Sequence, residues 1–173
     1  MIVDFSKLRD LRKSEKGKIV LGLGTFDLFH YEHLRYLQSA KEQGDILVVA
    51  IKDNYCASLK GKDRPIIDEF YRLSIVDNIK CVDYVVLVDY DQNIDTSIEY
   101  NNVEQLQWLS MFEKVFRELR PDILYYEFRE KLQPVRERVF KKYDVIGIPR
   151  MRTQLICTTS IVEKIKNDTQ SEM

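Results

Sequence analysis

Residues 19–37 read IVLGLGTFDLFHYEHLRYL, a short apolar run that turns through two glycines into a helical pattern. The run over residues 19–23 is aliphatic and partly β-branched, which is typical of a buried strand. Leu34 and Leu37 then recur at helical spacing on one face. A strand that leads directly into a helix through a glycine-containing turn is typical of an α/β domain, where this first turn commonly binds phosphate.

The rest of the chain repeats this alternation. Further short apolar runs predict strands, and apolar residues at helical spacing predict helices between them. Such an order predicts a single α/β, Rossmann-like, three-layer domain with a parallel five-stranded sheet and helices on both faces. Ligands of these sheets bind beyond the carboxyl ends of the strands, which points to residues 24–33. The other expected strands cover residues 46–51, 84–88, 123–126 and 145–148, and the expected helices include residues 34–40, 73–79 and 109–119.

The composition is that of an ordinary globular protein. The 173 residues are 45% hydrophobic and 32% charged with a net charge of −1, so nothing favours nucleic acid or a membrane as partner. The three cysteines form no CxxC pair, and the first residues lack the apolar core of a signal peptide, which predicts a cytoplasmic location. We expect an N-terminal extension over 1–17, one domain over 18–167 and a polar tail over 168–173.

The only two histidines, His30 and His33, lie at the predicted start of the first helix. At a spacing of three residues they share one helical face, beside the backbone N–H groups and the positive dipole end, and this arrangement suits phosphate oxygens. The alternative is that they only cap or pack the helix. A zinc site is not expected, because the metalloprotease helix spaces its histidines by four and no third ligand is evident.

Four motifs give the chain a resemblance to a known family. The segment GTFDLFHYEH resembles the GxFDxxHxGH signature of cytidylyltransferase-like nucleotidyltransferases, and most of all the glycerol-3-phosphate cytidylyltransferase branch. LKGKDRPI resembles the family's lysine-bearing loop, YRLSIVDNIKCVDYVV its following helix, and RTQLICTTSIVEKI its C-terminal RTEGISTTxIxxxI string. The order and approximate spacing agree from about residue 18 to residue 166.

The resemblance implies an in-line reaction, in which an acceptor phosphate oxygen attacks the α-phosphorus of a nucleoside triphosphate. Positioning and charge stabilisation then carry catalysis, and magnesium accompanies the nucleotide. Asp27 either stabilises the turn through backbone N–H groups or approaches that magnesium. The charged loop and the terminal threonines could equally be a solvated loop and ordinary helix caps. The implied catalytic residues are His30, His33, Lys60 and Arg152, and the implied nucleotide-binding residues are Gly24, Thr25, Phe26, Asp27, Lys62, Arg72, Lys80, Thr153, Ile156, Thr158 and Thr159.

The chain also departs from the family pattern. Glu32 replaces the glycine of HxGH, where the nucleotide approaches the helix, so its carboxylate must point away, pair with a cation, recognise a cationic acceptor, or prevent nucleotide binding. Leu155 and Cys157 replace the glycine and serine of the C-terminal string, near the expected base pocket. The segment LYYEFREKLQ at the fourth strand also departs from the family, and its Tyr125, Tyr126 and Glu127 suggest a different acceptor pocket.

The resemblance therefore predicts transfer of CMP from CTP to a small phosphorylated polyol, alcohol or similar acceptor, with release of pyrophosphate. One alternative is an ATP-dependent adenylyltransferase acting on a sugar phosphate, because TTSIVEKI suits that branch as well. Another is a nucleotide-binding homologue without catalysis. Relatives of this type are commonly homodimers, so a homodimer is also expected, with the N-terminal segment FSKLRDLRK as a candidate interface helix.

Overall fold

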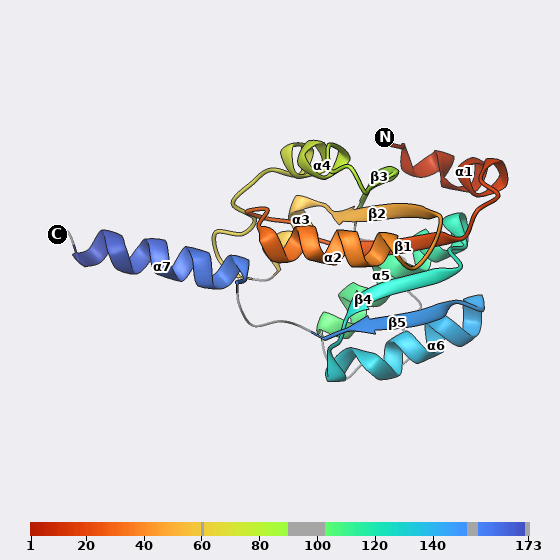
Figure 1. Ribbon diagram of the computed structural model, residues 1–173. Coiled ribbons are helices and arrows are strands. Elements are labelled where there is room, and N and C mark those ends of the chain that lie inside the picture. Colours follow the sequence, from red (N-terminus) through yellow and green to blue (C-terminus); the bar gives the residue numbers. More distant parts are fainter. Residues whose placement is uncertain (60, 90–102, 152–155, 172–173) are drawn as a thin grey trace.

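A five-stranded parallel sheet forms the centre of the protein (Figure 1). The computed structural model describes residues 1–59, 61–89, 103–151 and 156–171. The strand order is β3-β2-β1-β4-β5, so the chain builds outward from β1 in one direction and then returns to place β4 on the other side of β1. The strands are β1 (Ile19–Gly24), β2 (Ile46–Lys52), β3 (Tyr84–Val88), β4 (Ile123–Glu127) and β5 (Ile146–Arg150).

Helices cover both faces of the sheet, which confirms the predicted three-layer Rossmann-like fold. Buried side chains of α1, α5 and α6 pack on one face, and those of α2 and α4 pack on the other. The helices are α1 (Leu8–Ser14), α2 (Tyr31–Lys41), α3 (Asn54–Ser58), α4 (Glu69–Asp77), α5 (Val103–Leu119), α6 (Gln133–Tyr143) and α7 (Thr158–Ser171), with short 3-10 turns at Phe5–Lys7 and Glu130–Leu132.

The two core clusters follow from the alternation of side chains along each strand. Ile19 and Leu21 of β1 face one cluster, while Val20 between them faces the other. Because both faces are covered by helices, the strands are apolar at nearly every position rather than at every second one. The sequence therefore placed all five strands correctly, to within one or two residues at each end.

Several helices differ from the sequence-based expectation. The segment FSKLRDLRK does form a helix, but α1 buries Leu8 and Leu11 against its own domain. Helix α6 was not predicted, because only Val135 and Val139 mark its buried face within a highly charged sequence. Helix α7 extends away from the body in Figure 1 and continues to Ser171, into the segment that was expected to be a polar tail.

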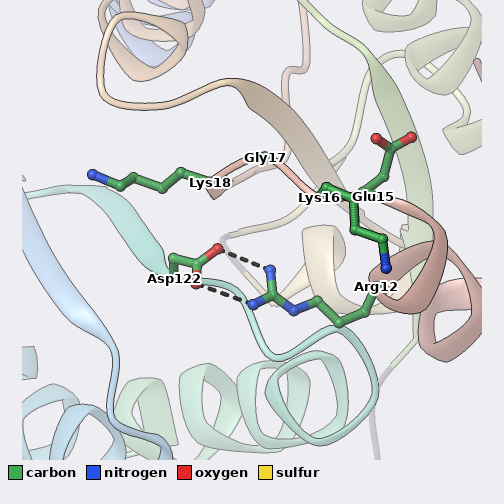
Figure 2. Close-up of a pocket in the computed structure, with 6 residues that line it drawn as sticks. All are labelled: Arg12, Glu15, Lys16, Gly17, Lys18 and Asp122. Carbon is green, nitrogen blue, oxygen red and sulfur yellow. Dashed lines mark hydrogen bonds and ion pairs between the residues drawn. The ribbon is translucent and has the colours of Figure 1, made fainter.

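Asp122 organises the amino edge of the sheet, opposite the edge that the sequence points to. Its carboxylate accepts two hydrogen bonds from the Arg12 guanidinium, at 2.9 and 3.1 Å, and one from the Ile19 N–H at 2.8 Å. Figure 2 shows this pair in a shallow hollow of about 350 Å³, which is also lined by Lys16 and Lys18. The pair connects α1 to the start of β4 and fixes the extension on the domain.

We expect the Asp122→Asn variant to lower the free energy of unfolding by about 1 kcal/mol at neutral pH, since the pair is partly exposed. Burial alone raises the pKa of Asp122, but the hydrogen bonds from Arg12 and Ile19 lower it overall. The charged carboxylate therefore stabilises the fold above its unfolded pKa, near 3.9, and this contribution is lost as the pH falls through the lower folded pKa. Urea unfolding from pH 7 to pH 2 measures this effect. An equal acid dependence in Asp122→Asn and the wild-type protein would contradict the assignment.

Candidate active site

Strands β1 and β4 separate at their carboxyl ends and leave a fork in the sheet. Their pairing ends at Gly22 and Tyr125, although β1 continues to pair with β2 through Gly24. The hydroxyl of Tyr36, from α2, lies between the two strands. It accepts a hydrogen bond from the Leu23 N–H at 3.1 Å and donates one to the Tyr125 carbonyl at 2.7 Å. The fork is thus at the point where the strand order reverses, where ligands of such sheets bind.

The turn after β1 has buried side chains. Thr25, Phe26 and Asp27 are all buried, with 7%, 2% and 5% of their surfaces exposed. Gly24 is required there, because a Cβ at this position would lie 2.7 Å from the Phe26 ring. Phe26 has a positive φ of 54°, which directs the chain from the strand toward the start of α2.

His30 and His33 meet at the start of α2, as predicted. His30 is the N-cap residue, and its ring stacks on that of His33 with centroids 3.9 Å apart. The Phe26 ring contacts the His33 ring edge-on at 5.3 Å and restricts its orientation. Tyr36 lies one turn beyond His33, and its ring also contacts Phe26, at 6.2 Å, so Phe26 connects the histidine pair to the tyrosine of the fork.

Asp27 connects three segments that the sequence analysis had linked only by resemblance. Its carboxylate accepts hydrogen bonds from the backbone N–H groups of Ile66 and Ile67, at 3.0 and 2.9 Å, and from Arg64 at 3.2 Å. Its backbone carbonyl accepts a hydrogen bond from the Thr158 hydroxyl at 2.8 Å. The lysine-bearing loop and the start of α7 therefore both attach to the turn before the histidines.

Arg72 is an internal clamp. Its side chain is fully buried, and it donates to the carbonyls of Thr25, Lys52 and Ile67 and to the Asn54 side chain, at 2.6 to 3.0 Å. Burial lowers the pKa of this guanidinium, although an arginine remains charged in proteins. The structure shows its donors bonded to the ends of β1 and β2, to α3 and to the loop between α3 and α4, and the nucleotide-binding role that the resemblance implies for Arg72 stays a prediction.

Glu32 forms an ion pair with Arg150, the last residue of β5. The Glu32 Oε2 atom lies 2.7 Å from Arg150 Nη2, and Arg150 Nη1 also donates to the Glu32 carbonyl at 3.3 Å. Both side chains are largely buried, with 12% of Glu32 and 15% of Arg150 exposed. The sequence left several orientations of the Glu32 side chain open. The structure shows it paired with a cation of the protein, Arg150.

The remaining predicted site residues fall into three groups. Lys62 is exposed on the loop fixed by Asp27, and Ile156 and Thr159 are exposed beside the start of α7. Lys80 lies in the connection before β3, which is at the amino edge, beside Leu34 and Gln38 of α2. Lys60, Arg152 and Thr153 lie outside the described residues, as does Leu155.

Sequence reasoning missed Tyr36 and Arg150. Tyr36 follows His30 and His33 at intervals of three residues, and this shared face was the available signal. Nothing in the sequence indicated Arg150, because its role depends on how close β5 approaches α2. Conversely, Tyr125 and Tyr126 were expected to shape an acceptor pocket, but they are buried in the two core clusters.

Comparison with known families identifies the chain. Residues 21–164 match the family described as Cytidylyltransferase-like, and this match covers the turn, the lysine-bearing loop and the first half of α7. The chain belongs to the cytidylyltransferase-like family. This membership confirms the resemblance of the four motifs and makes the protein an enzyme of the nucleotidyltransferase type.

Curated relatives of this cytidylyltransferase-like chain include the bifunctional protein HldE of Helicobacter pylori (strain HPAG1), which is 34% identical over 173 residues. The alignment covers 95% of this chain but 31% of that relative, so the chain spans about a third of its length. HldE of Geobacter metallireducens is 45% identical over 83 residues, which cover 47% of this chain and 17% of that protein.

Solved structures share the fold. The lipopolysaccharide core biosynthesis protein of Thermoplasma volcanium superposes with a TM-score of 0.59 at 25% identity, covering 81% of this chain and 99% of that one. A pantoate-beta-alanine ligase of Francisella tularensis, crystallised with beta-gamma ATP and beta-alanine, gives a TM-score of 0.60 at 16% identity over 89% and 67% of the two chains. The second likeness concerns the fold alone.

The role of Tyr36 can be tested through its hydroxyl. Tyr36→Phe should lower the free energy of unfolding by about 1–3 kcal/mol, because the Leu23 N–H and the Tyr125 carbonyl lose their partner in a buried place. Thermal and urea unfolding measure the loss. Tyr84→Phe is a matched control, since its hydroxyl bonds the Glu15 side chain at the amino edge and no backbone group. Equal stability of Tyr36→Phe and the wild-type protein would contradict a stabilising role for the Tyr36 hydroxyl between β1 and β4.

Proposed function

We propose that this protein transfers AMP from ATP to the phosphate of a small sugar phosphate and releases pyrophosphate. The observation that carries the proposal is the convergence on Asp27 of the histidine turn, the lysine-bearing loop and the start of α7. In the family resemblance, these three segments surround the triphosphate. The likeness to HldE over 95% of the chain, together with the lipopolysaccharide core biosynthesis protein, favours a sugar-derived acceptor.

The proposed chemistry is a single in-line displacement. An oxygen of the acceptor phosphate forms a bond to the α-phosphorus of ATP, and the bond from that phosphorus to the oxygen bridging to the β-phosphorus breaks. Pyrophosphate leaves with that electron pair. His30 and His33 donate hydrogen bonds to oxygens around the α-phosphorus, where charge increases in the transition state. Lys60, Lys62 and Arg152 neutralise the phosphates of the bound substrates.

Magnesium is part of the proposal as a companion of the nucleotide. Within the ranges that the structure describes, no group of three or more His, Cys, Asp or Glu residues could hold a metal ion. Asp27, the carboxylate in the turn after β1, already accepts hydrogen bonds from Arg64, Ile66 and Ile67. This fits an ion that binds mainly through phosphate oxygens and water, as magnesium commonly does with nucleoside triphosphates.

CTP is the second candidate donor. The family description and the partial string RTQLICTT favour it. The whole-chain likeness to HldE and the fit of TTSIVEKI to the sugar-phosphate branch favour ATP. The likeness to HldE carries more weight because it involves nearly the whole chain, whereas Leu155 and Cys157 interrupt the string that favours CTP.

Pyrophosphate release separates these candidates. The purified protein is incubated with magnesium, each of the four nucleoside triphosphates and a panel of sugar phosphates, with phosphorylated polyols and alcohols included. The proposal expects release with ATP and a sugar phosphate, and none after chelation of magnesium. Release with CTP and a polyol phosphate would favour the second candidate. If no combination released pyrophosphate although a nucleotide still bound, the protein would be a nucleotide-binding protein without turnover.

Once the active pair is known, His30→Ala should lower kcat about 100- to 1000-fold, as removal of one oxyanion donor does in other enzymes. The fold should change little, since the His30 side chain makes no cap hydrogen bond to the start of α2. Lys18→Ala, on the exposed amino edge, is the control and should keep full turnover. A His30→Ala enzyme with normal kcat would remove the histidine from the mechanism.

A further inference from the structure

We infer that Arg150 is a positioning residue, which keeps the Glu32 carboxylate out of the phosphate site at the start of α2. The inference rests on the proposed function only in placing a nucleoside triphosphate there. Arg150 acts through Glu32 and has no part in the chemistry itself. Its presence explains how an acidic residue is tolerated at a position where the family pattern has glycine.

The position of Glu32 creates the problem. It is the second residue of α2 and lies between His30 and His33 in the sequence. The first N–H groups of a helix lack helical acceptors and attract negative charge, so a carboxylate in the first turn is drawn to the same donors as a phosphate. Left to itself, the Glu32 side chain would compete with the nucleotide for this site and repel it.

Arg150 lies where it can hold the Glu32 carboxylate away from this site. Strand β5 is the edge strand beyond β4, and Arg150 at its carboxyl end reaches across to α2, on the other side of the fork between β1 and β4. Its guanidinium binds both the carboxylate and the backbone carbonyl of Glu32. This two-point contact fixes the direction of the Glu32 side chain, which a single contact from a flexible lysine would not do.

Burial strengthens the ion pair between Glu32 and Arg150. Only 12% of the Glu32 side chain and 15% of the Arg150 side chain are exposed, so the pair is weakly screened compared with surface ion pairs. Removal of Arg150 would leave a largely buried carboxylate without its guanidinium, and such a group moves toward water or toward other donors. The N–H groups at the start of α2, where the phosphates bind in the proposed function, are among the donors that Glu32, itself in the first turn, can approach.

The test is a rescue experiment on nucleotide binding, measured by titration calorimetry with magnesium and the nucleoside triphosphate that the wild-type protein binds best. Arg150→Gln should weaken binding about tenfold at low ionic strength, since one charge near a polyphosphate at a partly buried site contributes at least that much. The double variant Glu32→Gln with Arg150→Gln should recover to within about twofold of the wild-type Kd. Added salt should reduce the defect of Arg150→Gln, because the repulsion is then screened.

The matched control is Arg12→Gln, which breaks the two-point pair with Asp122 at the opposite edge (Figure 2). It should lower the melting temperature and leave the nucleotide Kd unchanged, which separates lost stability from lost binding. Melting temperatures of all variants are recorded alongside the Kd values.

Three outcomes would overturn the inference. Arg150→Gln could bind as tightly as the wild-type protein, the double variant could stay as weak as the single one, or the wild-type protein could bind no nucleoside triphosphate. The second outcome would mean that Arg150 contacts the nucleotide itself. The expected rescue without any pyrophosphate release would instead support the inference and remove the proposed function.

Discussion

The hydroxyl of Tyr36 is the contact on which the geometry of the site depends. It replaces the next rung of the β1–β4 ladder, since it binds the Leu23 N–H and the Tyr125 carbonyl that would otherwise remain unpaired at the end of the pairing. Burial raises the pKa of this hydroxyl, so it stays protonated and can serve as donor and acceptor at once. A parallel sheet can therefore open into a fork without leaving buried backbone groups unsatisfied, and the fork leads to the start of α2.

Around this fork, buried polar side chains connect loops that no regular secondary structure joins. Arg72 binds the carbonyls at the ends of β1 and β2, Asp27 binds the loop after α3 and the start of α7, and Arg150 binds Glu32. Each contact is a charged group paired with backbone or with an opposite charge, as burial requires. The exposed residues of the site are then free to contact substrates, because the internal contacts already fix the loops that carry them.

The sequence predicted those features that depend on local pattern. The five strands follow from short apolar runs, and the histidine pair follows from a spacing of three at the end of a strand and turn. The sequence could not reveal that Arg72 binds backbone carbonyls inside the protein, because an arginine with that role and an arginine that binds phosphate look the same in a sequence motif. Arg150 and Glu32 are 118 residues apart, so their pairing depends on strand order rather than on any spacing. Helix α6 was missed for a related reason, since its many charged residues conceal the two valines that pack on the sheet.

The most direct measurement of the central claim is a crystal structure of the protein with magnesium and a non-hydrolysable ATP analogue. We expect the α-phosphate within hydrogen-bonding distance of His30 and His33, with Glu32 still bonded to Arg150. A nucleotide bound elsewhere, or one that displaces Glu32 from Arg150 to reach the start of α2, would contradict it.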